Sequence, residues 1–134
     1  MSIPSRFEIS AAQIDQVVAR FYAAIRRDTT LGPVFARHVS DWPAHEEKIA
    51  RFWRNAILFE RSYDGNPMRV HREAGDVRPE HFTPWLALFD RTLRDTLPDP
   101  AADAWSALAH RIGAGLRLGV EDQQRPAGQP PVLR

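Results

Sequence analysis

The histidine best suited to chemistry in this chain is His71, which closes the segment YDGNPMRVH at Tyr63–His71. Gly65 tolerates a positive φ and Pro67 cannot continue a helix, so the preceding element must end there. Pro67 then suits the first position of a new short helix. An imidazole just beyond such a break is held at a fixed angle, which is what a single metal-ligating histidine needs. A histidine after a turn is more often a surface or packed residue, so the rest of the chain has to decide.

The remaining histidines narrow the chemistry, because the chain has five of them and no cysteine. No two lie three to five residues apart, as a structural zinc site prefers, and the Glu-x-x-His repeat of di-iron bundles is absent. Hydrolase, P-loop and dinucleotide motifs are missing too. One axial imidazole is what haem iron needs, since the porphyrin supplies four nitrogens. Without cysteine, such a haem has no covalent attachment motif. The five histidines are His38, His45, His71, His81 and His110.

Three polar side chains on apolar helix faces indicate what such a site would hold. If Tyr22 and Trp85 are buried, each donor must find a partner or cost about 1–3 kcal/mol. A core built only for packing would use Phe or Leu, so two such donors facing one cavity predict an electronegative ligand. His45 lies one turn before Ile49 and should point the same way. A partly exposed histidine near a helix start is an equally good interpretation of His45.

Helical periodicity predicts the elements that must position these residues. No segment alternates convincingly with period two, so an all-α domain is expected. Capping signals and prolines mark the helix starts. The predicted order is a loose arm over 1–9, helices over Ser10–Arg27, a single turn ending near Phe35, Asp41–Phe59, a short helix around His71, a loop over Glu73–Arg78, and helices opening at Pro79-Glu80 and Asp99-Pro100. The folded domain spans 10–120, and 121–134 is a disordered Pro-rich tail.

The length and composition of the chain limit the number of domains and the classes of partner that it can have. A chain of 134 residues with 43% hydrophobic content forms one domain with room for one sizeable ligand. Its net charge of +1 and lack of a basic stripe argue against nucleic acid. No apolar run approaches the ~20 residues that span a bilayer. The start MSIPSRFEIS lacks an apolar signal core, so we expect a cytoplasmic protein without a membrane partner.

Four segments together are similar to the truncated haemoglobins of the third group (the P-type). The resemblance runs from about Phe21 to Gly119, and order, spacing and residue types agree. The Gly-Gly pairs that mark the other truncated groups are missing, which fits the third group. The resemblance implies a two-over-two helical sandwich around haem b. The matching segments are FYAAIRRDTTLGPVF at Phe21–Phe35, WPAHEEKIARFW at Trp42–Trp53, YDGNPMRVH at Tyr63–His71 and HFTPWLALF at His81–Phe89.

The same resemblance implies roles for individual residues. His71 matches the proximal iron ligand, and Phe35 matches the phenylalanine that packs against the porphyrin. Tyr22, His45 and Trp85 match the polar side chains of the distal pocket. His81 matches no ligand position and is assigned to the haem edge or the surface, while His38 and His110 are expected to be solvated or capping residues. Further expected haem contacts are Ile49, Phe52, Met68, Val70, Phe82 and Leu86, with Lys48 and Arg72 either near the propionates or solvated.

Two functions of this site, and one function without haem, follow from these assignments. The first is reversible binding of O₂ or another diatomic ligand at ferrous haem. The alternative is a haem enzyme of peroxidase or nitric-oxide-detoxifying type, in which no catalytic residue is yet assigned. Such an enzyme would need a separate reductase, because the chain has no reductase domain of its own. The third possibility, a helical interaction module without haem, predicts a stable apoprotein.

Overall fold

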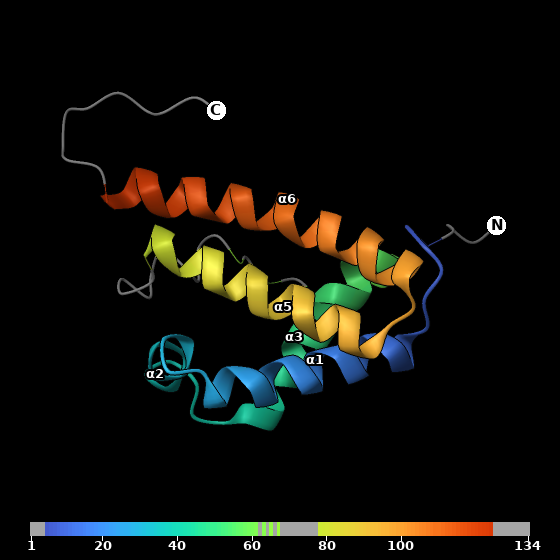
Figure 1. The fold of residues 1–134 in the computed structure, drawn as a ribbon, viewed down its shortest axis with the longest axis horizontal. Helices are drawn as coiled ribbons and strands as arrows, with labels where there is room; N and C mark the ends of the chain where they lie inside the picture. Colours follow the sequence, from blue (N-terminus) through green and yellow to red (C-terminus); the bar gives the residue numbers. More distant parts are fainter. Residues whose placement is uncertain (1–4, 62, 64, 66, 68–77, 125–134) are drawn as a thin grey trace.

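The computed structural model describes residues 5–61, 63, 65, 67 and 78–124 (Figure 1). Every regular element in these ranges is helical, which confirms the all-α expectation. None of the helices in the same ranges is long and apolar enough to cross a bilayer. The elements are α1 (Ala11–Arg27), α2 (Leu31–Ala36), α3 (Trp42–Leu58), the 3₁₀ turn η1 (Pro79–His81), α5 (Phe82–Thr96) and α6 (Asp99–Gln124).

The helices pack as two pairs. Helix α1 packs against α3, and α5 runs antiparallel to α6, to which it is joined by a short connection (Figure 1). Contacts between α1 and α5 hold the two pairs together. This arrangement is the predicted two-over-two sandwich. The short helix α2 packs against α1 and so lies at one end of this pair.

The start of α1 follows from a reciprocal cap. The Gln13 backbone N–H donates to Ser10 Oγ at 3.1 Å, and the Ser10 N–H donates to Gln13 Oε1 at 2.9 Å. Both residues thus satisfy backbone donors that the first turn would leave unpaired. The predicted helix over Ser10–Arg27 is confirmed, with Ser10 as the cap itself.

Helix α3 has distinctive ends at both sides. At its start, the Asp41 carboxylate accepts the Ala44 N–H at 3.0 Å, and Pro43 occupies the first turn. At its end, Phe59 takes a left-handed backbone with φ of 60°, a conformation usually filled by glycine. Its N–H still donates to the Asn55 carbonyl at 3.1 Å, so the last turn of α3 keeps its i→i−4 hydrogen bond. The predicted limits of this helix are therefore confirmed.

A stack of three aromatic rings occupies the centre of the core. Phe89 of α5 is fully buried and lies between Trp53 and Trp85, with ring centroids 5.6 Å and 5.2 Å away and planes within 16° and 13° of parallel. Phe21 of α1 meets Phe89 edge-on at 4.8 Å. Burial of each such ring contributes about 1.5–3 kcal/mol, so this stack joins α1, α3 and α5.

The described part of the N-terminal arm, residues 5–9, docks on α3 through Arg6, whereas the sequence predicts a loose arm over 1–9. The Arg6 backbone N–H donates to the Ile57 carbonyl at 2.9 Å, and its Nε donates to the Ala56 carbonyl at 2.7 Å. The guanidinium also lies over the Phe59 ring, 5.3 Å from its centroid. Helix ends leave four carbonyls without intrahelical partners, and the arm supplies donors for two near the end of α3.

Three further elements differ from the sequence expectation. Helix α6 continues to Gln124, so the first four residues of the proposed tail belong to the helix. The turn expected near Phe35 is the two-turn helix α2. The helix expected from Pro79 begins as the 3₁₀ turn η1 before α5. The short helix proposed around His71, most of the loop after it, and residues 125–134 lie outside the described residues.

Candidate functional site

Tyr22 and His45 meet at the junction of three helices. Tyr22 of α1 is only 3% exposed, and its ring meets the His45 imidazole of α3 edge-to-face, with centroids 5.0 Å apart and planes at 88°. Phe35 of α2 closes one side, 5.9 Å from Tyr22 and 6.4 Å from His45. The structure therefore brings together two of the three polar residues and the phenylalanine that the sequence assigned to one site.

Burial fixes the charge state of both polar groups. Desolvation raises the pKa of the Tyr22 hydroxyl far above its usual range, and the nearby Glu46 carboxylate adds to the shift. The hydroxyl therefore remains a proton donor at any physiological pH. Desolvation also lowers the pKa of His45 below 6.5, with a smaller contribution from the Lys48 cation. The imidazole is consequently neutral near pH 7.

The His45 Nε2 atom is buried and meets no hydrogen-bond partner among the described residues. A buried polar atom without a partner is uncommon in a native structure and calls for an explanation. Next to a protonated hydroxyl, it fits a site that receives a small polar ligand. The described residues thus fit the distal side of a haem pocket.

Trp85 of α5 joins this group through Phe21. The Phe21 ring lies 5.3 Å from Tyr22 and 5.2 Å from Trp85, edge-on to both. Trp85 is half-buried and stacks on Phe89, so its indole is anchored on one face by the core. The third predicted polar residue therefore lies one aromatic ring away from Tyr22.

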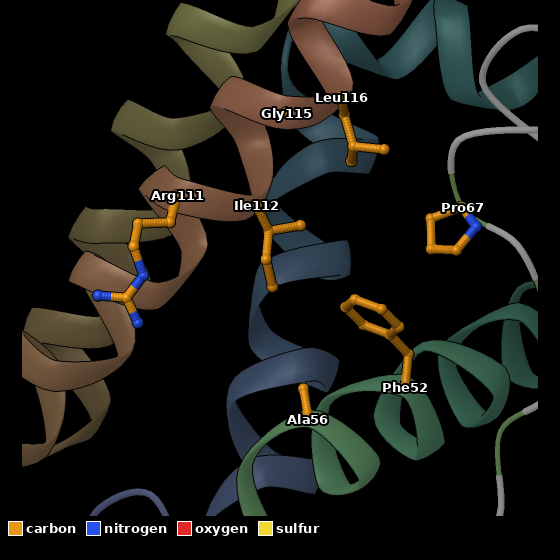
Figure 2. Close-up of a pocket in the computed structure, with 7 residues that line it drawn as sticks. All are labelled: Phe52, Ala56, Pro67, Arg111, Ile112, Gly115 and Leu116. Carbon is orange, nitrogen blue, oxygen red and sulfur yellow. The ribbon is translucent and has the colours of Figure 1, made fainter.

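An apolar pocket of about 340 Å³, largely open to solvent, lies between α3 and α6 (Figure 2). Phe52 and Leu116 point into it and Pro67 faces it from the other side, whereas Arg111 points away. The lining comes from Phe52, Ala56, Pro67, Arg111, Ile112, Gly115 and Leu116. Phe52 was an expected haem contact, whereas none of the α6 residues in this lining was assigned to a site from the sequence. The sequence signal for these α6 residues was the apolar pair Ile112 and Leu116, which are four residues apart and so lie on one face of the helix.

The other expected contacts divide by exposure. Lys48 is exposed, and His81 is half-buried with its Nδ1 accepting the Arg78 N–H at 3.0 Å. Phe82 is buried, and both Ile49 and Leu86 pack half-buried against the core. The remaining expected residues lie outside the described part of the chain: Met68, Val70, His71 and Arg72.

Three residues at this site were not assigned from sequence. Trp42, in the first turn of α3, lies 6.3 Å by ring centroids from both Tyr22 and His45. The Arg26 guanidinium carbon lies 5.2 Å above the Trp42 ring, and its Nη2 lies 3.6 Å from the Glu46 carboxylate. Trp42 was named from the sequence only as the first residue of a matching segment, although its i, i+3 spacing to His45 could have placed it here.

A second polar cluster joins α5 and α6. Asp90 accepts from Ser106 Oγ at 2.7 Å, and its other oxygen lies 2.8 Å from His110 Nε2. His110 is exposed, as the sequence suggested, and the structure adds Asp90 as its partner. Across the ranges that the structure describes, no three His, Asp or Glu side chains gather as a metal site.

Comparison with known proteins gives a consistent picture. No family model matches the chain. The chain is 33% identical over 93 residues to the group 3 truncated hemoglobin ctb of Campylobacter jejuni, a match that covers 66% of this chain and 73% of that protein. The crystal structure of a group III truncated hemoglobin from the same organism superposes with a TM-score of 0.80 at 27% identity, covering 90% of this chain and 95% of that one.

Proposed function

This chain belongs to the group 3 truncated hemoglobins, and from that premise we propose that it binds haem b and reversibly holds O₂ or another diatomic ligand. The observation that supports the proposal most is the contact between Tyr22 and His45. It combines a hydroxyl that stays protonated with a buried Nε2 atom that meets no partner in the described residues.

The segment that ends at His71 and the aromatic residues that line the described part of the site indicate which residues would hold the haem. His71 is proposed as the iron ligand, with Phe35 and Phe52 among the apolar contacts. The chain has no cysteine for thioether links, which favours non-covalent haem b. When bound, haem supplies an iron atom that takes up a diatomic ligand.

The distal side chains would then discriminate between ligands by polarity. The Tyr22 hydroxyl can donate and accept, whereas the Trp85 indole only donates. A hydrogen bond to a group that carries charge is worth about 1.5–3 kcal/mol, or roughly 10- to 150-fold in retention. Carbon monoxide is less polar than O₂ in such a pocket and should gain far less.

A peroxidase or nitric-oxide-detoxifying activity is the second candidate, and His45 is the residue that favours it. Its imidazole is half-buried, favours the neutral form and lies against the Tyr22 ring, so it can take up and return a proton within the pocket. Either activity would draw electrons from an external reductase that is still to be identified.

The first test is the cofactor. The purified protein should be red, with one haem per chain that acid–butanone extraction removes. Pigment that stays with the chain, or a colourless protein after reconstitution with haem, would contradict the proposal. On the same haem-loaded sample, slow O₂ release with negligible turnover supports a binding protein, and rapid peroxide or nitric oxide turnover with a reductant supports the enzyme.

The second test is the axial ligand. His71→Gly should abolish tight haem binding or make it dependent on added imidazole. His81→Ala should leave the absorption spectrum nearly unchanged, because its Nδ1 already serves the cap of η1. If the two variants exchange these behaviours, the proximal assignment is wrong.

A further inference from the structure

Arg26, in the last turn of α1, contacts two helices at the distal site. Its Nε donates to the Tyr22 carbonyl at 3.3 Å, within α1. Its Nη2 lies 3.6 Å from the Glu46 carboxylate, and its guanidinium lies over the Trp42 ring at 5.2 Å. One side chain therefore contacts the backbone of Tyr22 and two side chains of the first turns of α3.

These contacts surround His45 in the sequence of α3. Trp42 lies one turn before His45 and touches it, with ring centroids 6.3 Å apart, and Glu46 is the next residue. Because a helix turn is stiff, the position of Trp42 and Glu46 sets the position of His45. Arg26 is thus linked through α3 to the imidazole and through α1 to the Tyr22 ring that it meets.

The residue type also matters. A planar guanidinium can stack on an indole face while its N–H groups reach a carboxylate and a carbonyl, which a lysine ammonium does not reproduce. If a cation were needed only to complement the dipole at the end of α1, Arg27 could serve as well as Arg26, since both lie in the last turn. Arg26 alone of the two lies over Trp42.

We propose that Arg26 is a positioning residue of the distal pocket. Its contacts with Trp42 and Glu46, here called the clasp, hold the first turns of α3 against the end of α1. The clasp keeps His45 against Tyr22 and restricts entry of a diatomic ligand. The proposal rests on the proposed function, since entry matters only if the pocket takes up such a ligand. The Arg26 side chain is 44% exposed, and exposed charge contacts are individually weak. The clasp can therefore open on its own, as a restriction on entry requires.

The experiment measures carbon monoxide association after flash photolysis of the haem-loaded full chain. Arg26→Gln should speed association about two- to fivefold, the value of one exposed cation–π contact. Arg26→Lys keeps the charge and loses the stacking, so its rate should fall between parent and Arg26→Gln. Arg27→Gln removes the same charge from the same helix turn and is the matched control, with a rate equal to that of the parent.

Two structural readouts separate positioning from simple loss of stability. The infrared C–O stretch should broaden or split in Arg26→Gln, because the distal hydrogen bonds lose a single geometry, and the proton NMR contact between the Tyr22 and His45 rings should weaken. The Lys variant keeps the test available if the Gln variant does not fold. A rate and spectrum equal to those of the parent in both Arg26 variants, or equal effects in Arg27→Gln, would overturn the proposal. A parent chain that takes up no haem would instead defeat the proposed function, and the ring contact in the purified chain would still test the clasp.

Discussion

In the proposed distal site, Tyr22 and His45 both favour their neutral forms near neutral pH. The hydroxyl keeps its proton because burial opposes the phenolate, and the imidazole stays neutral because burial opposes the cation. The Tyr22 hydroxyl can therefore donate a hydrogen bond to a ligand, whereas the His45 Nε2 atom can donate or accept one, depending on the tautomer. This division of roles leads to two predictions at the scale of the residue.

Replacing Tyr22 by Phe should speed O₂ release from the haem-loaded protein by about 10-fold or more, the lower end of the value of a hydrogen bond to a charged acceptor. Trp85→Phe should act in the same direction, and the double variant should be non-additive, because Phe21 connects the two rings. His45→Leu should affect release less and peroxide reactivity more. Stopped-flow measurements give the O₂ release rates, and a peroxidase assay gives the reactivity with peroxide.

The other tyrosine provides the control. Tyr63 meets Phe52 at 5.3 Å between ring centroids, and Tyr63→Phe keeps that ring, so this variant should leave the O₂ release rate within about twofold. A Tyr22→Phe rate as close to the parent as that control would remove the proposed distal hydrogen bond.

His45 should also impose a pH dependence on stability. Its pKa in the folded chain is lowered from 6.5, so the unfolded chain takes up this proton first as the pH falls. The free energy of unfolding should therefore drop below about pH 6.5 and lose no more from this group once the pH passes the lower folded pKa. The Lys48 cation adds to the lowering of the His45 pKa that burial causes.

Urea unfolding of the parent and of His45→Leu, at about pH 8 and about pH 5, tests this dependence. The variant should lose less stability on acidification than the parent, because it lacks the group that must be charged. The same loss in both proteins would show that His45 is not desolvated in the folded chain.

At the scale of the element, the ring stack around Phe89 fixes how α5 lies on α1 and α3. Phe89→Ala should lower the free energy of unfolding by about 3–5 kcal/mol, since it removes a fully buried ring between two indoles. Phe89→Leu keeps most of the volume and should cost less. Chemical denaturation measures both values, and a loss below about 1 kcal/mol for the alanine variant would show that the stack does not hold these helices.

Which elements could be predicted depends on how local their signals are. The cap formed by Ser10 and Gln13 and the start at Asp41 rest on neighbours three residues apart, and both were predicted correctly. The docking of Arg6 onto α3 joins residues about fifty positions apart, and no local pattern in the arm announces it. The contact of His110 with Asp90 likewise depends on the packing of α5 on α6.

The candidate site likewise contains residues that the sequence could indicate and a residue whose contacts depend on how the helices pack. Tyr22, His45 and Phe35 were assigned together by family resemblance, and the structure places their rings in contact. The clasp residue Arg26 has no motif of its own, because its role arises only when the end of α1 meets the start of α3. Resemblance therefore named three side chains that the structure places side by side, and it did not name Arg26, which lies next to them.

For the whole molecule, haem should act as a stabilising ligand. A ligand that binds only the folded chain adds about 2.7 kcal/mol when present at a hundredfold excess over its Kd. For a domain of this size, each kcal/mol raises the Tm by roughly 2–8 °C. Calorimetry should therefore show a Tm at least about 5 °C higher with haem than without it.

The comparison with His71→Gly makes this result specific. That variant should lose most of the increase in Tm and regain part of it when imidazole is added with the haem. Equal Tm values for the parent with and without haem would mean that the folded domain does not hold the cofactor.

Phe59 illustrates a choice that would matter to anyone redesigning this scaffold. Glycine is the usual replacement for a residue held at a left-handed helix end, and at a φ of 60° it would relieve backbone strain. Here, however, the Phe59 ring is also the platform for the Arg6 guanidinium. A consensus-guided glycine would gain at one backbone position and weaken the docking of the arm on α3. Optimisation here has to treat Arg6 and Phe59 as one unit rather than as two independent sites.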